Sequence, residues 1–257
     1  MPYIERPEVS GQGARIFYTS SGSGPALLLC HGFSATSTMW AGQIAAFKER
    51  YQVICWDMRG HGESDSPDDP ALYTVDGTVQ DMAAILDACS AQRAVICGHS
   101  LGGFMSLAFS LRHPERVRAL ILCNTGPGYK SDTARADWNV MAEKQARAFA
   151  KKGLAAVGHS EEMQLGTHRT AKGLEHGARG MLAQSDASII DSLPHIAVPA
   201  LVLVGEKDRG YLAAADYMAE KIPNARKIVI ENAGHAANLH QPAAFNRAAG
   251  DFLNSLA

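Results

Sequence analysis

The sequence lacks any strong excess of charge. Its 257 residues carry 24 Lys and Arg against 26 Asp and Glu, which gives a formal net charge of -2. A protein that binds nucleic acid or an anionic membrane through its surface needs a basic excess, so we expect neither partner. The balance favours a small, neutral or weakly charged molecule as the partner.

The sequence also lacks an apolar run of membrane-spanning length, which is about 20 residues. The N-terminus reads MPYIERPEVSG, with acidic residues and two prolines where a secretory signal would have a basic start and an apolar stretch. Cysteines number only five, without a C-x-x-C pair, and four of them lie inside apolar runs. We therefore expect a cytoplasmic protein with free, buried thiols.

Short apolar runs and helical patterns alternate along most of the chain. The runs are apolar at successive positions, which is typical of parallel strands covered by helices on both faces. The sequence thus predicts an α/β fold with a mostly parallel sheet of about eight strands, including two antiparallel strands near the N-terminus. The expected strands lie near 3–9 and 14–20, and at 26–30, 51–57, 94–98, 117–124, 200–208 and 227–234; the expected helices lie near 37–49, 75–90, 101–113, 212–222 and 242–256.

The alternation stops between about residues 125 and 185. No convincing strand occurs there, and two helical patterns do, SDTARADWNVMAEKQARAFAKKG and roughly residues 170–184. We expect one α/β core built from residues 1–124 and 185–257. Residues 125–184 would be inserted into it as a helical cap.

The stretch VICGHSLGG, residues 95–103, runs from a predicted strand through Ser100 into a predicted helix. Ligand sites in such sheets lie beyond the carboxyl ends of the strands. The glycines on both sides of Ser100 fit the sharp turn that presents a nucleophilic serine in a G-x-S-x-G motif. We therefore predict that Ser100 is the catalytic nucleophile.

A serine nucleophile needs a base, and the base needs a group that holds it. The strand ends ALVLVGEKD and ENAGHAANL supply Asp208 as the acid and His235 as the base. Glu206 is the alternative acid, although it lies earlier in its turn. The chain after the preceding strand reads CNTGPG and offers no carboxylate, which favours Asp208.

The oxyanion of an acyl-transfer reaction needs fixed hydrogen-bond donors. We predict the backbone N–H groups of Leu101 and Phe33, the second from the loop HGFS after the strand at 26–30. Gly32 would let this backbone approach the substrate. The Trp40 side chain is a candidate for the substrate pocket, although a core position is the stronger interpretation.

Two other histidines and one loop lie near these motifs. His99 adjoins the serine, but its side chain should point away from Ser100, and we expect His31 to brace loops. The stretch WDMRGHGESD has glycines and an arginine, yet it lacks the G-x-x-x-x-G-K-[ST] pattern of a phosphate loop, so we interpret it as a structural turn.

Together, the motifs HGF, DMRGHGES, GHSLGG, GEKD and GH resemble the α/β-hydrolase superfamily, in the branch of haloperoxidase-like esterases, enol-lactonases and C–C bond hydrolases. The resemblance runs nearly end to end and implies the α/β-hydrolase fold, with Ser100, Asp208 and His235 as the triad. One departure is LHQP, with His240 where members often have L-E-x-P; we expect it to affect helix capping.

The residues and the resemblance predict a serine hydrolase that cleaves a small carboxylic ester or lactone through an acyl-enzyme, without a metal or organic cofactor. Three alternatives stay open. The same triad serves C–C bond hydrolysis of a ring-cleavage diketone, and perhydrolysis with haloperoxidase-like activity can accompany esterase chemistry. A member of a different class, a ligand-binding receptor, would bind tightly and turn over negligibly.

Overall fold

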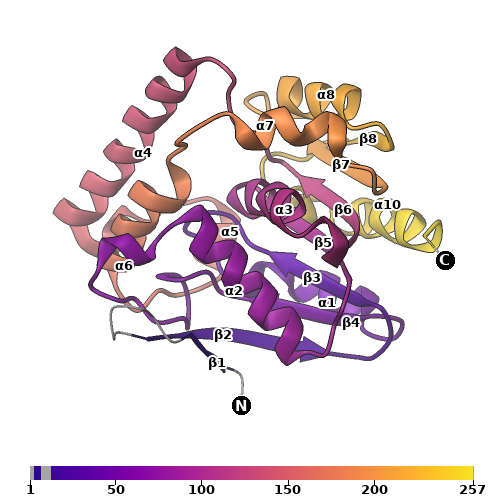
Figure 1. The fold of residues 1–257 in the computed structure, drawn as a ribbon, viewed down its shortest axis with the longest axis horizontal. Helices are drawn as coiled ribbons and strands as arrows, with labels where there is room; N and C mark the ends of the chain where they lie inside the picture. Colours follow the sequence, from indigo (N-terminus) through magenta and orange to yellow (C-terminus); the bar gives the residue numbers. More distant parts are fainter. Residues whose placement is uncertain (1–2, 7–12, 257) are drawn as a thin grey trace.

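The computed structural model describes residues 3–6 and 13–256, which form an eight-stranded sheet in the order β1-β2-β4-β3-β5-β6-β7-β8 (Figure 1). Strand β2 pairs antiparallel with β1 and β4, and every other neighbouring pair is parallel. The predicted α/β fold with its mostly parallel sheet is confirmed. The strands are β1 (Tyr3–Arg6), β2 (Ala14–Ser21), β3 (Ala26–Cys30), β4 (Gln52–Trp56), β5 (Ala94–His99), β6 (Val117–Cys123), β7 (Ala200–Gly205) and β8 (Ala225–Ile230).

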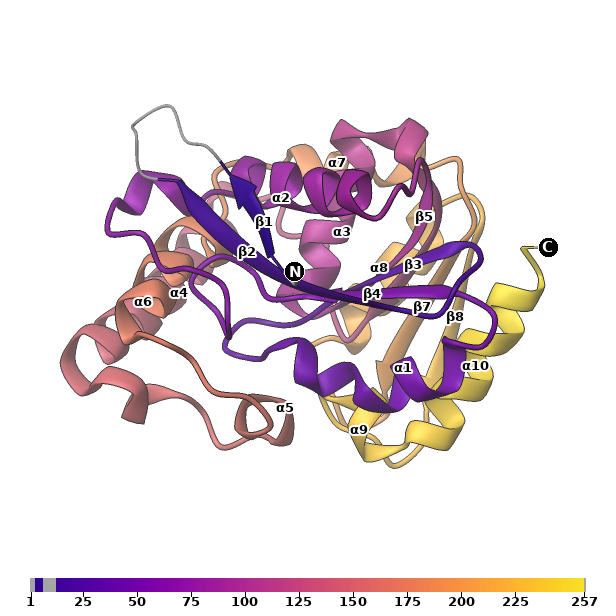
Figure 2. The same cartoon turned by 90° about the horizontal axis from the view of Figure 1, so that it is seen from below.

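Helices cover both faces of this sheet, because its strands are apolar at successive positions (Figure 2). On one face, Leu28 and Ile96 belong to a core shared with α2 (Val75–Ala88), α3 (Leu101–Arg112) and α8 (Leu212–Lys221). On the other, Leu29 and Cys97 belong to a core shared with α1 (Ala41–Phe47) and α10 (Pro242–Asn254). Since neighbouring residues of a strand face opposite ways, both helix layers are needed to bury it.

The strands differ from the sequence prediction mainly at their ends and at one edge. Residues 7–9, expected to continue the first strand, lie outside the described residues. Strand β8 is only partly buried, and Val229 is 39% exposed, because β8 has a partner on one side only. Strand β8 contacts α8 and α10, which belong to opposite layers, but they cover this edge strand less completely than the central strands.

The chain between β6 and β7 contains helices and no strand within the part that the structure describes. Its long helix α4 (Asp132–Lys152) packs against α6 (Ala171–Gly177) at the end of the molecule away from the C-terminus (Figures 1 and 2). Two short helices that the sequence did not predict, α5 (Glu161–Gln164) and α7 (Ser188–Ser192), belong to the same stretch. The assignment of residues 125–184 as a cap stays a prediction.

The cysteines are unpaired, as the sequence predicts. All five cysteines are free, and only Cys89 is not fully buried. Among the described residues, no helix is long and apolar enough to cross a membrane.

The topology brings two loops together at one edge of the sheet. Strands β3 and β5 are neighbours in the sheet. The chain after β3 leads to β4 on one side, and the chain after β5 leads to β6 on the other side, so the two loops leave in opposite directions. Such a point in a parallel sheet is where ligand sites form. The register pairs Cys30 with Gly98, which places the loop 31–34 beside Ser100.

Gly98 and Gly102 allow the backbone to turn tightly from β5 into α3. A Cβ added to Gly98 would lie 2.2 Å from the Gly102 carbonyl oxygen and 2.5 Å from the Gly103 nitrogen. A Cβ on Gly102 would lie 2.3 Å from the carbonyl oxygen of Cys30. Since these neighbours are backbone atoms, they cannot move aside without separating the strand from the helix.

We expect Gly98→Ala to lower the free energy of unfolding by about 2–3 kcal/mol, because an overpacked junction must shift its backbone. Gly42 in α1 is the matched control, since an added Cβ there meets nothing within 4 Å. Gly42→Ala should stabilise the fold by about 0.5–1 kcal/mol, because alanine favours the helix. Urea unfolding of both variants tests this, and equal stabilities would contradict it.

Candidate active site

Ser100 occupies the turn between β5 and α3 with φ 51° and ψ -118°. Its N–H donates to the Cys123 carbonyl oxygen (3.0 Å), and its own carbonyl accepts from the Thr125 hydroxyl (2.6 Å). A non-glycine residue in this conformation is strained and persists only where its surroundings hold it. The backbone contacts of the next strand, β6, therefore fix the direction in which the Ser100 side chain leaves the turn.

Asp208 and His235 form a hydrogen-bonded pair. Asp208 follows β7 and His235 follows β8, and His235 Nδ1 lies 2.9 Å from Asp208 Oδ2. The Asp208 carboxylate is nearly buried, whereas the imidazole is 31% exposed on its side chain. This contact sets the tautomer, because Nδ1 donates to the carboxylate and Nε2 is left as the free acceptor.

Asn124, at the end of β6, donates from Nδ2 to the same Asp208 oxygen (2.8 Å) and to the Gly234 carbonyl (3.2 Å). It has φ 47°, a conformation that asparagine tolerates better than most residues. Asn124 therefore joins the acid to the turn that carries His235. The alternative acid, Glu206, is exposed and accepts instead from the Asn232 N–H (2.9 Å).

Two rings hold the His235 imidazole between them. The Tyr211 ring lies on one side, with centroids 4.9 Å apart, and the His99 ring lies 4.8 Å away. His99 Nε2 also donates to the His235 carbonyl oxygen (2.9 Å). His99 therefore positions His235 rather than contacting the cavity beside Ser100.

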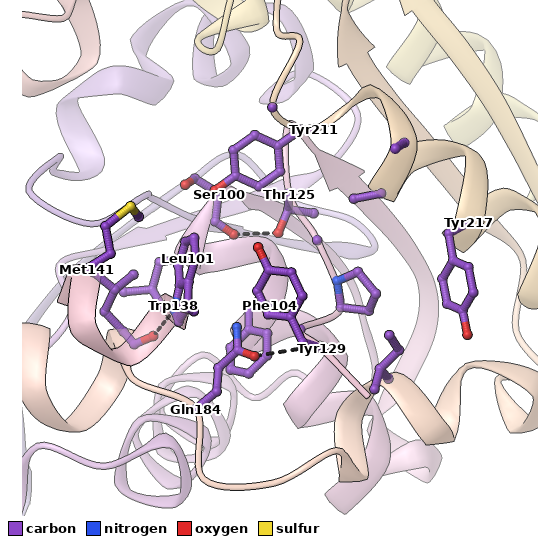
Figure 3. A pocket seen from close by; sticks show the side chains of 18 residues that line it. Ser100, Leu101, Phe104, Thr125, Tyr129, Trp138, Met141, Gln184, Tyr211 and Tyr217 are labelled. Atoms are coloured by element: carbon purple, nitrogen blue, oxygen red, sulfur yellow. Dashed lines mark hydrogen bonds between the residues drawn. The ribbon is translucent and has the colours of Figure 1, made fainter. Parts of the chain in front are cut away.

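Tyr211 also faces Ser100. Burial raises the pKa of Tyr211, and a hydrogen bond with the Ser100 side chain opposes that rise. In Figure 3 the Tyr211 ring lies directly beside Ser100. Among the described residues, no hydrogen bond joins Ser100 Oγ to His235, whose Nδ1 bonds Asp208.

The loop after β3 lies against the serine turn. A Cβ on Gly32 would lie 2.7 Å from His99 Nδ1 and 3.1 Å from the Ser100 Cβ, so only glycine fits this approach. In the described part of the chain, neither the Phe33 N–H nor the Leu101 N–H donates a hydrogen bond. Both groups are therefore available as donors.

A cavity of about 510 Å³ opens beside Ser100 (Figure 3). Its wall comes from the start of α3, the loop after β6, α4 and α8. The lining residues are Ser100, Leu101, Phe104, Thr125, Gly126, Pro127, Gly128, Tyr129, Trp138, Met141, Leu182, Gln184, Ile190, Gly210, Tyr211, Ala213, Ala214 and Tyr217. A volume of this size suits a small organic ligand.

The position of this cavity corrects the expectation for Trp40. That side chain is fully buried and packs near Phe245 in the core beneath α1 and α10, with ring centroids 6.3 Å apart. It does not line the cavity. The apolar lining comes instead from Leu101 and Phe104 of α3 and from residues 126–217, where the sequence pattern did not identify substrate contacts.

Three buried histidines brace the loop 31–34. His31 Nε2 accepts from the Met58 N–H (2.9 Å), and His61 lies between the His31 and His168 rings at 5.2 and 5.7 Å. His168 accepts from the Gly62 N–H (3.1 Å) and donates to the Ser34 carbonyl (3.0 Å). Residues between α5 and α6 are thereby tied to the loop that carries the Phe33 N–H.

His240 lies at the one position where the sequence departs from the resembled pattern. Its Nδ1 accepts from the Gly234 N–H (2.9 Å), immediately before His235. The expected effect was on helix capping, and the contact observed is with the turn of the base. In the sequence, only the short separation of Gly234 and His240 indicates that these two residues can contact each other.

A test of Asn124 is its replacement by aspartate. Asn124→Asp would place a second buried carboxylate beside Asp208, and such a pair cannot ionise fully, so one pKa rises in the folded state. The unfolded chain releases that proton near pH 4. The variant should therefore lose stability relative to wild type as pH rises from 4.5 to 7.5, by about 2–4 kcal/mol in total.

Urea unfolding at several pH values measures this difference. Asn224→Asp is the control, because Asn224 is exposed and donates only to the Ala197 carbonyl. A destabilisation by Asn124→Asp that does not change with pH would contradict the prediction.

The buried histidines give a second pH prediction. Burial lowers the pKa of His31, His61, His99 and His168, so the folded state resists protonation while the unfolded chain takes up protons below about pH 6.5. Stability should therefore fall as pH drops below about 6.5, by up to about 1.4 kcal/mol per pH unit for each histidine.

Replacing one of these histidines should reduce the slope of the unfolding free energy against pH. His61→Gln keeps a donor for the Arg59 carbonyl and removes one titrating group. We expect a shallower dependence of the unfolding free energy between pH 7.5 and 5.5 than in wild type or in His195→Gln, which changes an exposed residue. Equal slopes in all three proteins would refute it.

The described residues contain no cluster of His, Cys, Asp and Glu that could hold a metal ion.

Comparison with known proteins identifies the family. A family model described as the alpha/beta hydrolase fold matches residues 25–176. A 3-oxoadipate enol-lactonase of Acinetobacter baylyi is 30% identical, over 93% of each chain. A thermophilic esterase of Thermogutta terrifontis, crystallised with malate, has a TM-score of 0.83 at 27% identity, covering 100% of this chain and 99% of its own.

A second solved structure agrees with these. The enol-lactonase of Burkholderia xenovorans has a TM-score of 0.78 at 26% identity, covering 98% of this chain and 100% of its own. The resemblance inferred from the motifs is thus confirmed. The chain is a hydrolase of the α/β-hydrolase fold family.

Proposed function

We propose that the protein is a serine hydrolase that cleaves a small carboxylic ester or lactone through an acyl-enzyme intermediate. The observation that carries this proposal is the position of Ser100, which is held in a strained turn, lines a cavity of about 510 Å³ and contacts Tyr211, the ring that also packs on His235 of the Asp208–His235 pair. The lactonase and esterase names of the similar proteins support the same reaction class.

In the proposed first step, Ser100 Oγ attacks the substrate carbonyl carbon while His235 Nε2 takes the hydroxyl proton. Asp208 keeps the imidazole oriented and stabilises its positive charge. The negative charge on the carbonyl oxygen would be met by the Phe33 and Leu101 N–H groups, the second at the start of α3. Collapse of this intermediate breaks the bond to the leaving oxygen, which takes the proton from His235.

The second step reverses these roles with water. His235 takes a proton from a water molecule, whose oxygen attacks the acyl carbon bound to Ser100. Collapse returns the proton to Ser100 Oγ and releases the carboxylic acid. In a lactone, the leaving oxygen stays attached to the acyl group, so the product is a single hydroxy or keto acid.

Replacement of Ser100 tests the nucleophile. Ser100→Ala should lower kcat for p-nitrophenyl acetate, butyrate and octanoate by at least about 1,000-fold, because removing the nucleophile leaves only binding and oxyanion stabilisation. Ser185→Ala, at an exposed serine that does not line the cavity, should keep wild-type rates.

The outcomes separate the reaction classes. Equal turnover by wild type and Ser100→Ala would refute the proposal. Absence of turnover in both, with tight saturable ligand binding, would favour a receptor. Turnover of a ring-cleavage diketone without turnover of esters would favour C–C bond hydrolysis.

A further inference from the structure

The cavity beside Ser100 has a wall without charge. None of the eighteen residues that line it is Asp, Glu, Lys, Arg or His. Its larger side chains are aromatic or apolar, and the Tyr129 and Trp138 rings lie 6.0 Å apart. Figure 3 shows these rings, with Phe104 and Tyr211, around the space in front of Ser100.

Three polar groups on this wall are hydrogen-bonded within the protein. Trp138 Nε1 donates to the Leu182 carbonyl (2.8 Å), and the Thr125 hydroxyl donates to the Ser100 carbonyl (2.6 Å). Gln184 Oε1 accepts from the Tyr129 N–H (3.2 Å). These contacts support the wall, and the donors that remain on it, such as the Tyr129 hydroxyl and Gln184 Nε2, are uncharged.

Among the described residues, no cationic side chain lines the cavity, although Lys130 and the exposed Arg209 adjoin lining residues in the sequence. Lys130, next to the lining residue Tyr129, forms an ion pair with Asp191 at 3.2 Å. Arg135, one turn into α4, forms an ion pair with Asp132 and donates to two backbone carbonyls. Neither side chain lines the cavity, so neither is placed to neutralise an anion within it.

A carboxylate that enters such a site loses its hydration without gaining a partner, which is strongly unfavourable. An alkyl or aryl group gains from the same burial, and aromatic walls add favourable contacts with a ring. The cavity wall therefore favours uncharged groups of a substrate over charged groups of similar shape.

We propose that the part of the substrate in this cavity is an uncharged alkyl or aryl group, and that the enzyme rejects esters with a carboxylate there. This rests on the proposed serine hydrolase function. It separates the chain from the Acinetobacter baylyi relative, which is named for 3-oxoadipate, a dicarboxylate.

Two matched substrate pairs test the proposal. Ethyl hexanoate and monoethyl adipate differ by a terminal methyl or carboxylate on the acyl chain. 4-Methylphenyl acetate and 4-acetoxybenzoate differ in the same way on the alcohol side. We expect kcat/KM to be at least 100-fold higher for the uncharged member of one pair at least, and that pair identifies which part of the substrate enters the cavity. Ratios within threefold in both pairs, or a preference for either carboxylate, would overturn the proposal.

Salt separates burial from long-range repulsion. A preference caused by the overall charge of the protein should shrink between 0.05 and 0.5 M NaCl, because surface charges are screened. A preference caused by the cavity wall should persist. Loss of the preference at high salt would overturn the assignment to the cavity.

A lysine introduced into the cavity should weaken the preference for the uncharged ester over the carboxylate ester. Met141 lines the cavity and is 51% exposed, so Met141→Lys can be accommodated at its mouth. Val140, its neighbour on α4, is 71% exposed and does not line the cavity, so Val140→Lys adds the same charge outside it. We expect Met141→Lys to raise turnover of the carboxylate ester and so to lower the ratio of kcat/KM for the uncharged ester to kcat/KM for the carboxylate ester at least tenfold. We expect Val140→Lys to leave this ratio unchanged. An unchanged ratio in Met141→Lys, or equal narrowing in both variants, would count against the proposal.

Labelling separates this inference from the proposed function. An alkyl fluorophosphonate reacts with an activated serine whatever the charge of the natural acyl group, and peptide mass spectrometry locates the adduct. Label on Ser100 together with a preference for the carboxylate ester would overturn only the substrate class. Absence of both label and ester hydrolysis would overturn the serine hydrolase proposal itself.

Discussion

The close approach of β5 to α3 is the constraint on which the rest of the site depends. Gly98 and Gly102 have no room for a side chain, so the chain turns within one residue and Ser100 takes a positive φ. The cost of this conformation is met by hydrogen bonds from β6 and Thr125 to the Ser100 backbone. Because β3 is the parallel neighbour of β5, the same packing sets the loop 31–34 against the serine. A turn with larger residues would separate the nucleophile from both its helix and its proposed oxyanion donors.

The His235 imidazole is held by a shell of contacts rather than by Asp208 alone. Its ring lies between Tyr211 and His99, its carbonyl accepts from His99, and the preceding Gly234 is bonded by Asn124 and His240. The loops after β6, β7 and β8 carry no regular structure of their own and would otherwise be free to move. A polar network of this kind fixes the orientation of a base more narrowly than one hydrogen bond, which is what proton transfer over a short distance requires.

The sequence was sufficient for the sheet and for the pairing of Asp208 with His235, because both depend on local patterns at strand ends. It was insufficient for the shell around them. The absence of a carboxylate in CNTGPG was used to exclude an acid after β6, yet Asn124 in that stretch donates to the acid from the next strand. Trp40 was a substrate candidate because it follows the HGF loop, but the helix η1 (Ser37–Trp40) turns it into the core. Cavity walls depend on how α4 and α8 pack over the sheet, and no short-range pattern encodes that packing.

The sheet with its strand-end loops and the segment between β6 and β7 therefore have different roles. The sheet and its strand-end loops set the positions of Ser100, Asp208 and His235, which are independent of what the substrate carries beyond its carbonyl group. The segment between β6 and β7 supplies most of the cavity wall with uncharged side chains, of which Trp138 and Thr125 donate hydrogen bonds to backbone carbonyls. A wall built in this way is stable without a ligand, because it has no unpaired charge to solvate. The same property underlies the proposed selectivity, since a charged group would enter only at the cost of its own hydration.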